Sequence, residues 1–319
     1  MVHPILKLVA QRIALGLVLL WAASVLIFIG TQILPGDVAQ SILGQSATPV
    51  SLANLRAELG LNDPPLTRYM IWASGVLHGD LGHALTNGQD IADAMGKRLG
   101  NTLFLAFWAA VISIPLAVSL GLLAVRYRGR WPDKLISTVT LATVSVPEFL
   151  LGYILVYVLS VKFRLLPSLA TINDGMSFGD KLYAISLPVL VLVLVVLGHM
   201  MRMTRAAILN VMQSPYIETA ELKGLRPIAV IARHAFPNAI APVVNVVMLN
   251  LAYLVVGVVV VEVVFVYPGM GQYLVDHVAK RDVPVVQACG LVFAAIYIGL
   301  NIVADVVSIL ANPRLRHPK

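Results

Sequence analysis

The chain has 319 residues, of which 59% are hydrophobic and only 12% are charged. An ordinary soluble domain carries roughly 25% charged residues, so this composition excludes a soluble enzyme or binding domain and indicates an integral membrane protein. The single cysteine, Cys289, excludes an internal disulfide. The formal net charge of +7 would by itself suit a nucleic acid partner.

Six segments are apolar and long enough to cross a bilayer, which takes about 20 residues in a helix. We predict an all-α membrane protein with spans near Ile13–Leu34, Asn101–Val125, Leu135–Val161, Ile185–Met201, Ala239–Val266 and Val285–Leu310. Pro147 interrupts the third span, which we expect to tilt, kink or break there. The fourth span is the shortest.

Basic residues orient the chain. If the N-terminus is cytoplasmic, segments 1–12, 126–134, 202–238 and 311–319 are cytoplasmic as well, and they hold 14 of the 23 Lys and Arg residues. This is the asymmetry that the positive-inside rule describes, so both termini are predicted inside. A nucleic-acid surface would not be divided among four short segments, and we therefore expect no nucleic acid partner.

Three regions follow from this topology. Residues 1–34 are predicted to form an uncleaved anchor helix, because the apolar run is too long for a signal peptide. Residues 35–100 form a polar extracytoplasmic insert, with a short helix over 52–60 that ends at Gly60 and turns at 63–65 and 79–82. Residues 101–319 form the membrane core.

The sequence lacks the motifs of common catalytic sites. It has no glycine-rich phosphate loop and no H-E-x-x-H, and its seven His residues are scattered. We therefore expect no catalytic residue, metal or cofactor in this chain, and any ATP must be bound by another subunit.

Three acidic residues lie in or at the ends of spans: Glu148, Glu262 and Asp305. An ionisable group in hydrocarbon costs at least a few kcal/mol unless it faces water or a partner. Glu148, beside Pro147, and Glu262 are candidates for a polar translocation path, with a purely structural role as the alternative for each. For Asp305 we favour a local role, in which water or a basic residue satisfies the carboxylate.

A polar island, Ser214-Pro-Tyr-Ile-Glu-Thr-Ala-Glu-Leu-Lys-Gly224, separates two spans within 202–238. Ser214 can cap a helix whose first turn holds Pro215, and Gly224 can end it in a left-handed conformation. A helix this short is not stable alone, so it needs something to pack against. We predict a coupling element for a soluble motor.

The island resembles the EAA-type loop of ABC importer permeases: Glu218-Thr219-Ala220, then Gly224, then Phe236-Pro237, with Thr219, His234 and Phe236 as mild departures. The resemblance extends over nearly the whole chain. Leu34-Pro-Gly-Asp37, Gly79-Asp-Leu-Gly82, Ser145-Val-Pro147, Arg202-Met-Thr-Arg205, Tyr267-Pro-Gly-Met-Gly271, Arg281-Asp282 and Asn312-Pro-Arg314 are similar to the B-type permease of dipeptide, oligopeptide and nickel importers.

This resemblance implies a six-span type I permease in the bacterial inner membrane. It also implies a homologous C-type permease, two ATPase subunits that bind ATP and Mg, and an extracytoplasmic binding protein as partners. Glu218, Thr219, Ala220, Gly224 and Arg226 would couple the permease to an ATPase, with small residues such as Ala220 permitting close approach. Transport would proceed by alternating access.

Several functions remain open at this point. Peptides are the favoured cargo, with nickel chelates, glutathione-like thiols, opines or sugar conjugates as alternatives. Two other classes are a membrane-embedded enzyme, which would need catalytic residues clustered at one depth, and a stand-alone secondary transporter, which would need internal symmetry and more spans.

Overall fold

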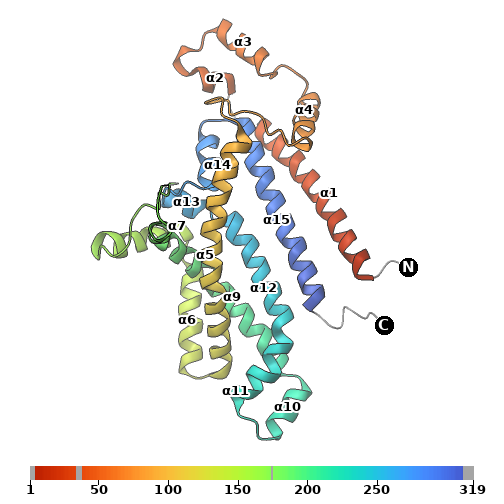
Figure 1. Ribbon diagram of the computed structural model, residues 1–319, viewed down its shortest axis with the longest axis vertical. Coiled ribbons are helices and arrows are strands. Elements are labelled where there is room, and N and C mark those ends of the chain that lie inside the picture. Colours follow the sequence, from red (N-terminus) through yellow and green to blue (C-terminus); the bar gives the residue numbers. More distant parts are fainter. Residues whose placement is uncertain (1–3, 34–37, 174, 312–319) are drawn as a thin grey trace.

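The computed structural model describes residues 4–33, 38–173 and 175–311. Within these ranges the chain is built from helices, with one isolated bridge between His83 and Asp90 in place of any strand. Figure 1 shows an elongated molecule, with the insert helices α2 (Val38–Leu43), α3 (Pro49–Glu58) and α4 (Pro65–Leu77) at one end. The short helices α10 (Pro215–Leu222) and α11 (Pro227–Ala229) lie at the opposite end. The all-α prediction is confirmed.

Five helical stretches of the described chain are long and apolar enough to cross a membrane. They are α1 (Pro4–Ile33), α5 (Ile91–Arg126), α9 (Ser186–Met212), α15 (Val283–Ala311) and the continuous stretch Pro227–Val264, which comprises α11, the π-helical η3 (Val230–Ala235), α12 (Phe236–Gly257) and α13 (Val259–Val264). A bent helix pair supplies the sixth crossing if the two helices are counted as one span.

The predicted third span is broken at its proline. Helix α6 (Trp131–Ser145) is followed by α7 (Glu148–Leu155) and the π-helical η2 (Val156–Lys162), and the two halves meet at 104°. Pro147 has no N–H to donate and excludes the helical conformation from the residue before it. Val146 accordingly adopts the extended values φ −92° and ψ 129°.

The predicted fourth span was wrong in length. Helix α9 runs for 27 residues to Met212, where we expected it to end at Met201. Of its most apolar stretch of 18 residues, 67% is buried. It is the central helix of the core and packs against α5, α6 and α12. In the part of the helix beyond Arg202, Arg205 forms a bidentate ion pair with Asp133 of α6, with both N–O distances at 2.9 Å.

Small residues let the central helices approach closely. A Cβ placed on Gly198 of α9 would lie 2.5 Å from the carbonyl oxygen of Thr140 on α6. On the other side, a Cβ on Gly121 of α5 would lie 3.0 Å from Thr204. Close backbone approach of this kind is how membrane helices pack without a hydrophobic driving force between them.

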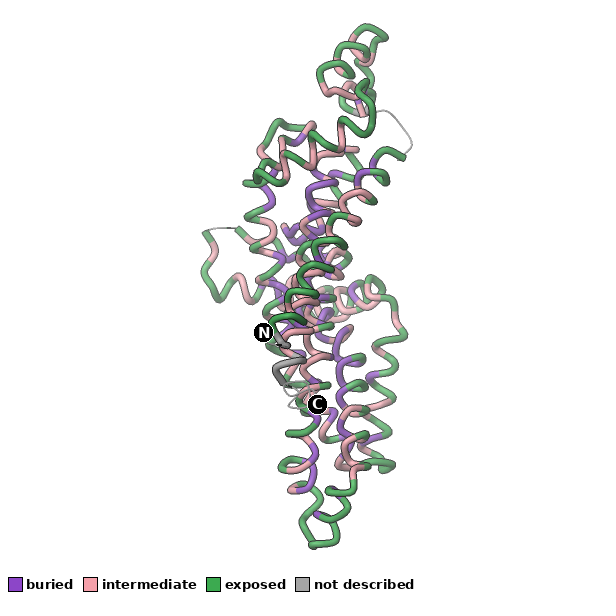
Figure 2. Tube along the Cα trace, turned by 90° about the vertical axis from the view of Figure 1, so that its right-hand side faces the viewer, coloured by how far each residue is buried: buried purple, intermediate pink, exposed green. Residues whose placement is uncertain are grey.

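Helix α1 lies at the edge of the bundle and packs mainly against α15 (Figure 1). Gln287 on α15 donates to Thr31 at 2.8 Å, and Arg12 pairs with Asp305 at 3.2 Å. Asp305 therefore has the local role that the sequence favours. Figure 2 shows exposed residues along the outer faces and buried ones along the centre, as expected of a protein whose rim faces lipid.

The insert is ordered around its own caps and one buried carboxylate. Thr48 and Ser51 form a capping box at the start of α3, which ends before Gly60 at φ +62°. Asp282, at the turn between α14 (Met270–Ala279) and α15, accepts from the amides of Leu85 and Thr86. The last ten residues of the predicted insert already belong to α5, because Asp90 caps that helix by accepting from the Asp93 amide at 3.0 Å. Helix α8 (Phe178–Ala184) and the single turn η1 (Gly44–Ser46) complete the fold.

Candidate coupling helix and translocation surface

Helix α10 forms where the polar island predicts it. Pro215 occupies its first turn, and Gly224 adopts φ +76° two residues after the last helical residue. A Cβ on Gly224 would meet open space, so the left-handed backbone alone favours glycine there. Ser214 stands at the N-cap position, but its side chain makes no capping hydrogen bond, so that part of the prediction was wrong.

One face of α10 packs on the permease's own core. Ile217 is 1% exposed and Ala220 is 4% exposed, in a cluster with Ile208 of α9 and with Val230 and Ile231 of η3. The interpretation of Ala220 as a residue that lets a partner approach must therefore be corrected, because its small side chain brings α10 close to this chain instead. Burial of this face supplies the stability that eight residues lack on their own.

The opposite face is free for a partner. Glu218, Thr219 and Arg226 are all exposed, as a contact surface requires. Sequence reasoning missed a set of exposed apolar side chains around them, which includes Leu222 at 82% exposure and Ile228 at 63% together with Tyr216 and Leu225. Exposed apolar residues gathered in one place mark an interaction surface. Leu222 inside the polar island, and Leu225 and Ile228 directly after it, were the available signal.

Glu148 lines a cavity of about 560 Å³ between α6, α7, α9 and α12. It is the first residue of α7, where the positive end of the helix dipole stabilises an acidic side chain. The hydroxyl of Tyr253 donates to its Oε2 at 3.3 Å, and its Oε1 is buried without a hydrogen-bond partner. Pro147, His199 and Asn250 also line this cavity, so the structure brings Pro147 and Glu148 together with polar groups of α9 and α12.

Glu262 does not line an open path in this structure. Its side chain is fully buried, and its carboxylate accepts from Thr102 at 2.6 Å and from the amides of Gly271 and Gln272 at 2.7 and 3.1 Å. The carboxylate thus fixes the turn between α13 and α14 onto α5. The assignment to the path must be corrected, because an acid at a span end can be satisfied by backbone amides that the sequence does not reveal.

His199 and Tyr253 are the residues of the Glu148 cavity that sequence reasoning missed. A lone His in an apolar helix is more often structural, and only the fold places His199 beside Glu148. The sequence holds only a weak signal for Tyr253. Tyr253 and Asn250 lie three residues apart on one face of α12, but neither has a polar partner nearby in sequence.

Comparison with known proteins assigns this arrangement to a family. Residues 113–317 match the family described as binding-protein-dependent transport system inner membrane component, and residues 5–120 match the N-terminal region of such membrane components. The chain belongs to this family. It is a multi-pass permease subunit of an ABC importer in the bacterial inner membrane, and the family is not catalytic.

Curated relatives align with nearly the full length of the permease. A probable peptide ABC transporter permease of Sinorhizobium fredii is 32% identical over 97% of this chain and 99% of the relative. A putative peptide transport system permease of Brucella abortus is 35% identical over 98% of both chains. A glutathione transport system permease of Escherichia coli is 36% identical over 98% of this chain and 99% of the relative.

A solved structure shows the same fold. The MetNI methionine ABC transporter, in inward-facing conformations, matches 70% of the permease and 96% of the solved chain, with a TM-score of 0.50 and 16% identity. Membership of this family implies ATPase subunits, a binding protein and a second permease as partners.

Proposed function

We propose that this permease pairs with a homologous C-type permease to form the translocation path of a di- and oligopeptide importer that works by alternating access. The observation that carries the proposal is the docking surface of α10, which is fixed to the core by Ile217 and Ala220 and exposes Glu218, Leu222 and Arg226 at the end opposite the insert. Two ATPase subunits would hold ATP and Mg, and one would contact this surface.

The geometry supports a lever role for α10. The helix is joined to α9 by two residues, and the turn at Gly224 and the short helix α11 join it to η3, so a displacement of α10 would be passed to α9 and α12. An extracytoplasmic binding protein would deliver cargo at the insert end. Peptide cargo is supported by the Sinorhizobium and Brucella relatives, and the Escherichia relative favours glutathione as a second candidate.

The Glu148 cavity is the part of this chain that we assign to the path. A carboxylate with one unpartnered oxygen, set among Tyr253, His199 and Asn250, can contact the ammonium or amide groups of passing cargo. The regions 1–34, 35–100 and 101–319, with the loop 202–238, remain our proposed division into anchor, insert and core.

Substitution at Gly224 tests the coupling role. Gly224→Val should keep the complex assembled but abolish the stimulation of ATPase activity by liganded binding protein, because a β-branched residue is strained at φ +76°. Gly224→Asn is the matched control and should retain most stimulation, since asparagine tolerates this conformation. ATPase assays on the reconstituted complex measure both. Unchanged stimulation in Gly224→Val would reject α10 as the coupling helix.

A further inference from the structure

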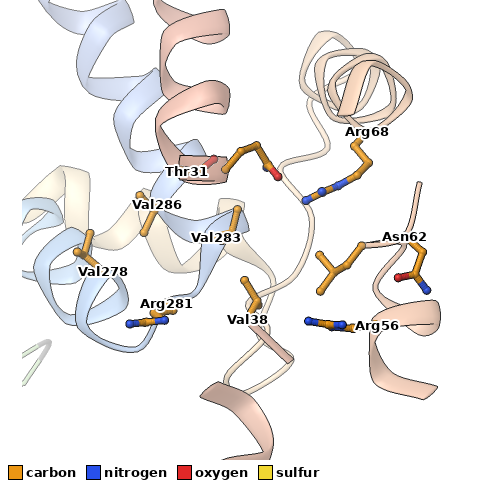
Figure 3. Close-up of a pocket in the computed structure, with 11 residues that line it drawn as sticks. Thr31, Val38, Arg56, Asn62, Arg68, Val278, Arg281, Val283 and Val286 are labelled. Carbon is orange, nitrogen blue, oxygen red and sulfur yellow. The ribbon is translucent and has the colours of Figure 1, made fainter. Parts of the chain in front are cut away.

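A cavity of about 500 Å³ between the extracytoplasmic insert and the adjoining ends of α1, α14 and α15 has an unusual concentration of cationic groups. Three arginines line it: Arg56 of α3, Arg68 of α4 and Arg281 at the turn before α15. No acidic residue is among the described residues that line it. Figure 3 shows Arg56 and Arg68 on the insert side and Arg281 across the cavity from them, with Val38 and Val283 between.

Two of these guanidinium groups have no partner within the described chain. Neither the Arg68 nor the Arg281 side chain makes an ion pair or a hydrogen bond among the described residues, although both residues are half-buried. The natural partner for Arg281 would be its neighbour Asp282, but that carboxylate is committed to the amides of Leu85 and Thr86 and to the Thr86 hydroxyl. The fold therefore keeps the cation of Arg281 available.

The backbone at Arg281 adds a second observation. Its φ of +58° is left-handed, a conformation that costs a non-glycine residue of order 1 kcal/mol or more. Glycine would relieve this cost, and asparagine or aspartate would reduce it. Arg281 places a long cationic side chain where the backbone favours glycine, which agrees with a site that needs a guanidinium.

A second cavity, with acidic residues in its lining, adjoins the first. A neighbouring cavity of about 460 Å³ shares Val38, Leu61, Arg68 and Val283 with the first. Its lining includes the carboxylates of Glu58, Asp63 and Asp80. Because the two cavities share these residues, we name them together the outer cleft, with a cationic half lined by the three arginines and an anionic half lined by the three acidic residues.

We propose that the outer cleft is a binding site for a small zwitterion of the peptide class, with the cargo's carboxylate on Arg68 and Arg281 and its ammonium toward the acidic half. Guanidinium groups bind carboxylates through paired charge-assisted hydrogen bonds. The volume is that of a small-molecule site and not of a flat protein interface. This inference rests on the proposed peptide-import function and places a receiving site for cargo on the permease itself.

Direct binding to the complete importer, without its binding protein, tests the proposal. The probes are dialanine, dialanine amide, which lacks the carboxylate, and N-acetyl-dialanine, which lacks the ammonium. Calorimetric titration of the complex in neutral-lipid nanodiscs measures their affinities. We expect each modified probe to bind roughly tenfold or more weakly than dialanine, since each loses a charge-assisted interaction. Equal affinity for all three probes would overturn the proposal.

Substitutions in the cleft supply the matched comparison. Arg68→Gln and Arg281→Gln should each weaken dialanine binding roughly tenfold. Lys280→Gln removes the same charge from the exposed residue next to Arg281, which does not line the cleft, and should leave the affinity unchanged. If Lys280→Gln weakens binding equally, the effect is one of general charge and the assigned site is wrong.

The carboxylate could also come from the binding protein. In that case Arg281→Gln would reduce the stimulation of ATPase activity by the binding protein while leaving dialanine affinity unaltered, and the cargo site would be rejected. The proposed import function is tested separately. If the wild-type complex shows no cargo-dependent ATPase activity with its binding protein, that function fails whatever the dialanine titration gives.

Discussion

Two glycines of this permease are required for different physical reasons. At Gly224 the backbone is left-handed at φ +76°, and a Cβ would meet open space. At Gly269 the backbone has an ordinary φ of −96°, but a Cβ would collide with the carboxylate of Glu262. At Gly224 the backbone conformation disfavours a side chain, and at Gly269 there is no space for one. Only the second reason depends on a residue from elsewhere in the fold.

At the same turn, Glu262 provides a test of its corrected role. Glu262→Ala should lower the stability of the complex by about 3 kcal/mol or more, because three buried donors lose their acceptor. Glu262→Gln keeps the size and one acceptor oxygen, so we expect assembly and transport to be largely retained. Thermal unfolding of the purified complex measures the first effect. Intact assembly with abolished transport in Glu262→Gln would restore the path assignment.

Glu148 should behave in the opposite way. Glu148→Gln should leave assembly unchanged but reduce peptide uptake into proteoliposomes by roughly tenfold, because a neutral amide binds a cargo ammonium more weakly. Tyr253→Phe, which removes only the hydroxyl that donates to Glu148, should have a smaller effect on uptake. Loss of the assembled complex in Glu148→Gln would show that the carboxylate is structural.

At the scale of elements, the core is organised around α9. Gly198 brings it against α6, Thr204 meets Gly121 of α5, and its cytoplasmic half supports α10 through Ile208. The Asp133–Arg205 pair joins α6 to this half of α9, with the Asp133 side chain only 6% exposed. Because α10 rests on the same helix, the proposed movement of α10 would act on this contact.

The ion pair between α6 and α9 can be tested by a double-mutant cycle. Arg205→Ala should destabilise the complex by about 3 kcal/mol, because it leaves a buried carboxylate unpaired. Asp133→Asn combined with Arg205→Ala should cost less than the sum of the single changes. Thermal unfolding of the four complexes measures the coupling. Strict additivity would mean that the two side chains do not stabilise one another.

At the scale of the whole molecule, the insert helices and α10 lie at opposite ends (Figure 1), and buried residues gather between the two ends (Figure 2). The insert carries the outer cleft, and the opposite end carries the surface of α10. The Glu148 cavity lies on the intervening core. This order, from outer cleft to core cavity to α10, agrees with the proposed path of the cargo and the proposed contact with an ATPase subunit.

Cysteine labelling tests the predicted orientation directly. Cys289 is fully buried, so the wild-type chain should not react with a membrane-impermeant maleimide. Leu77→Cys in the insert, where the side chain is 85% exposed, should be labelled in intact spheroplasts. Leu222→Cys on α10, 82% exposed, should be labelled only after the membrane is opened. The reverse pattern would invert the topology.

The sequence alone determined the class and the family, and it predicts the orientation and the position of α10, because each rests on local information. Apolar length, the distribution of Lys and Arg, and a proline and a glycine around a short polar helix are all readable along the chain. The same local information predicts an irregularity at Pro147, as a tilt, a kink or a break, and the structure has the break. Only the tertiary structure decided the length of α9, the burial of Ala220, the enclosure of Glu262 and the outer cleft. In each case the deciding residue lies elsewhere in the sequence. Arg205 of α9 pairs with Asp133, the inner face of α10 packs on Ile208 and η3, and Glu262 accepts from Thr102. Arg281 lines the same cavity as Arg68.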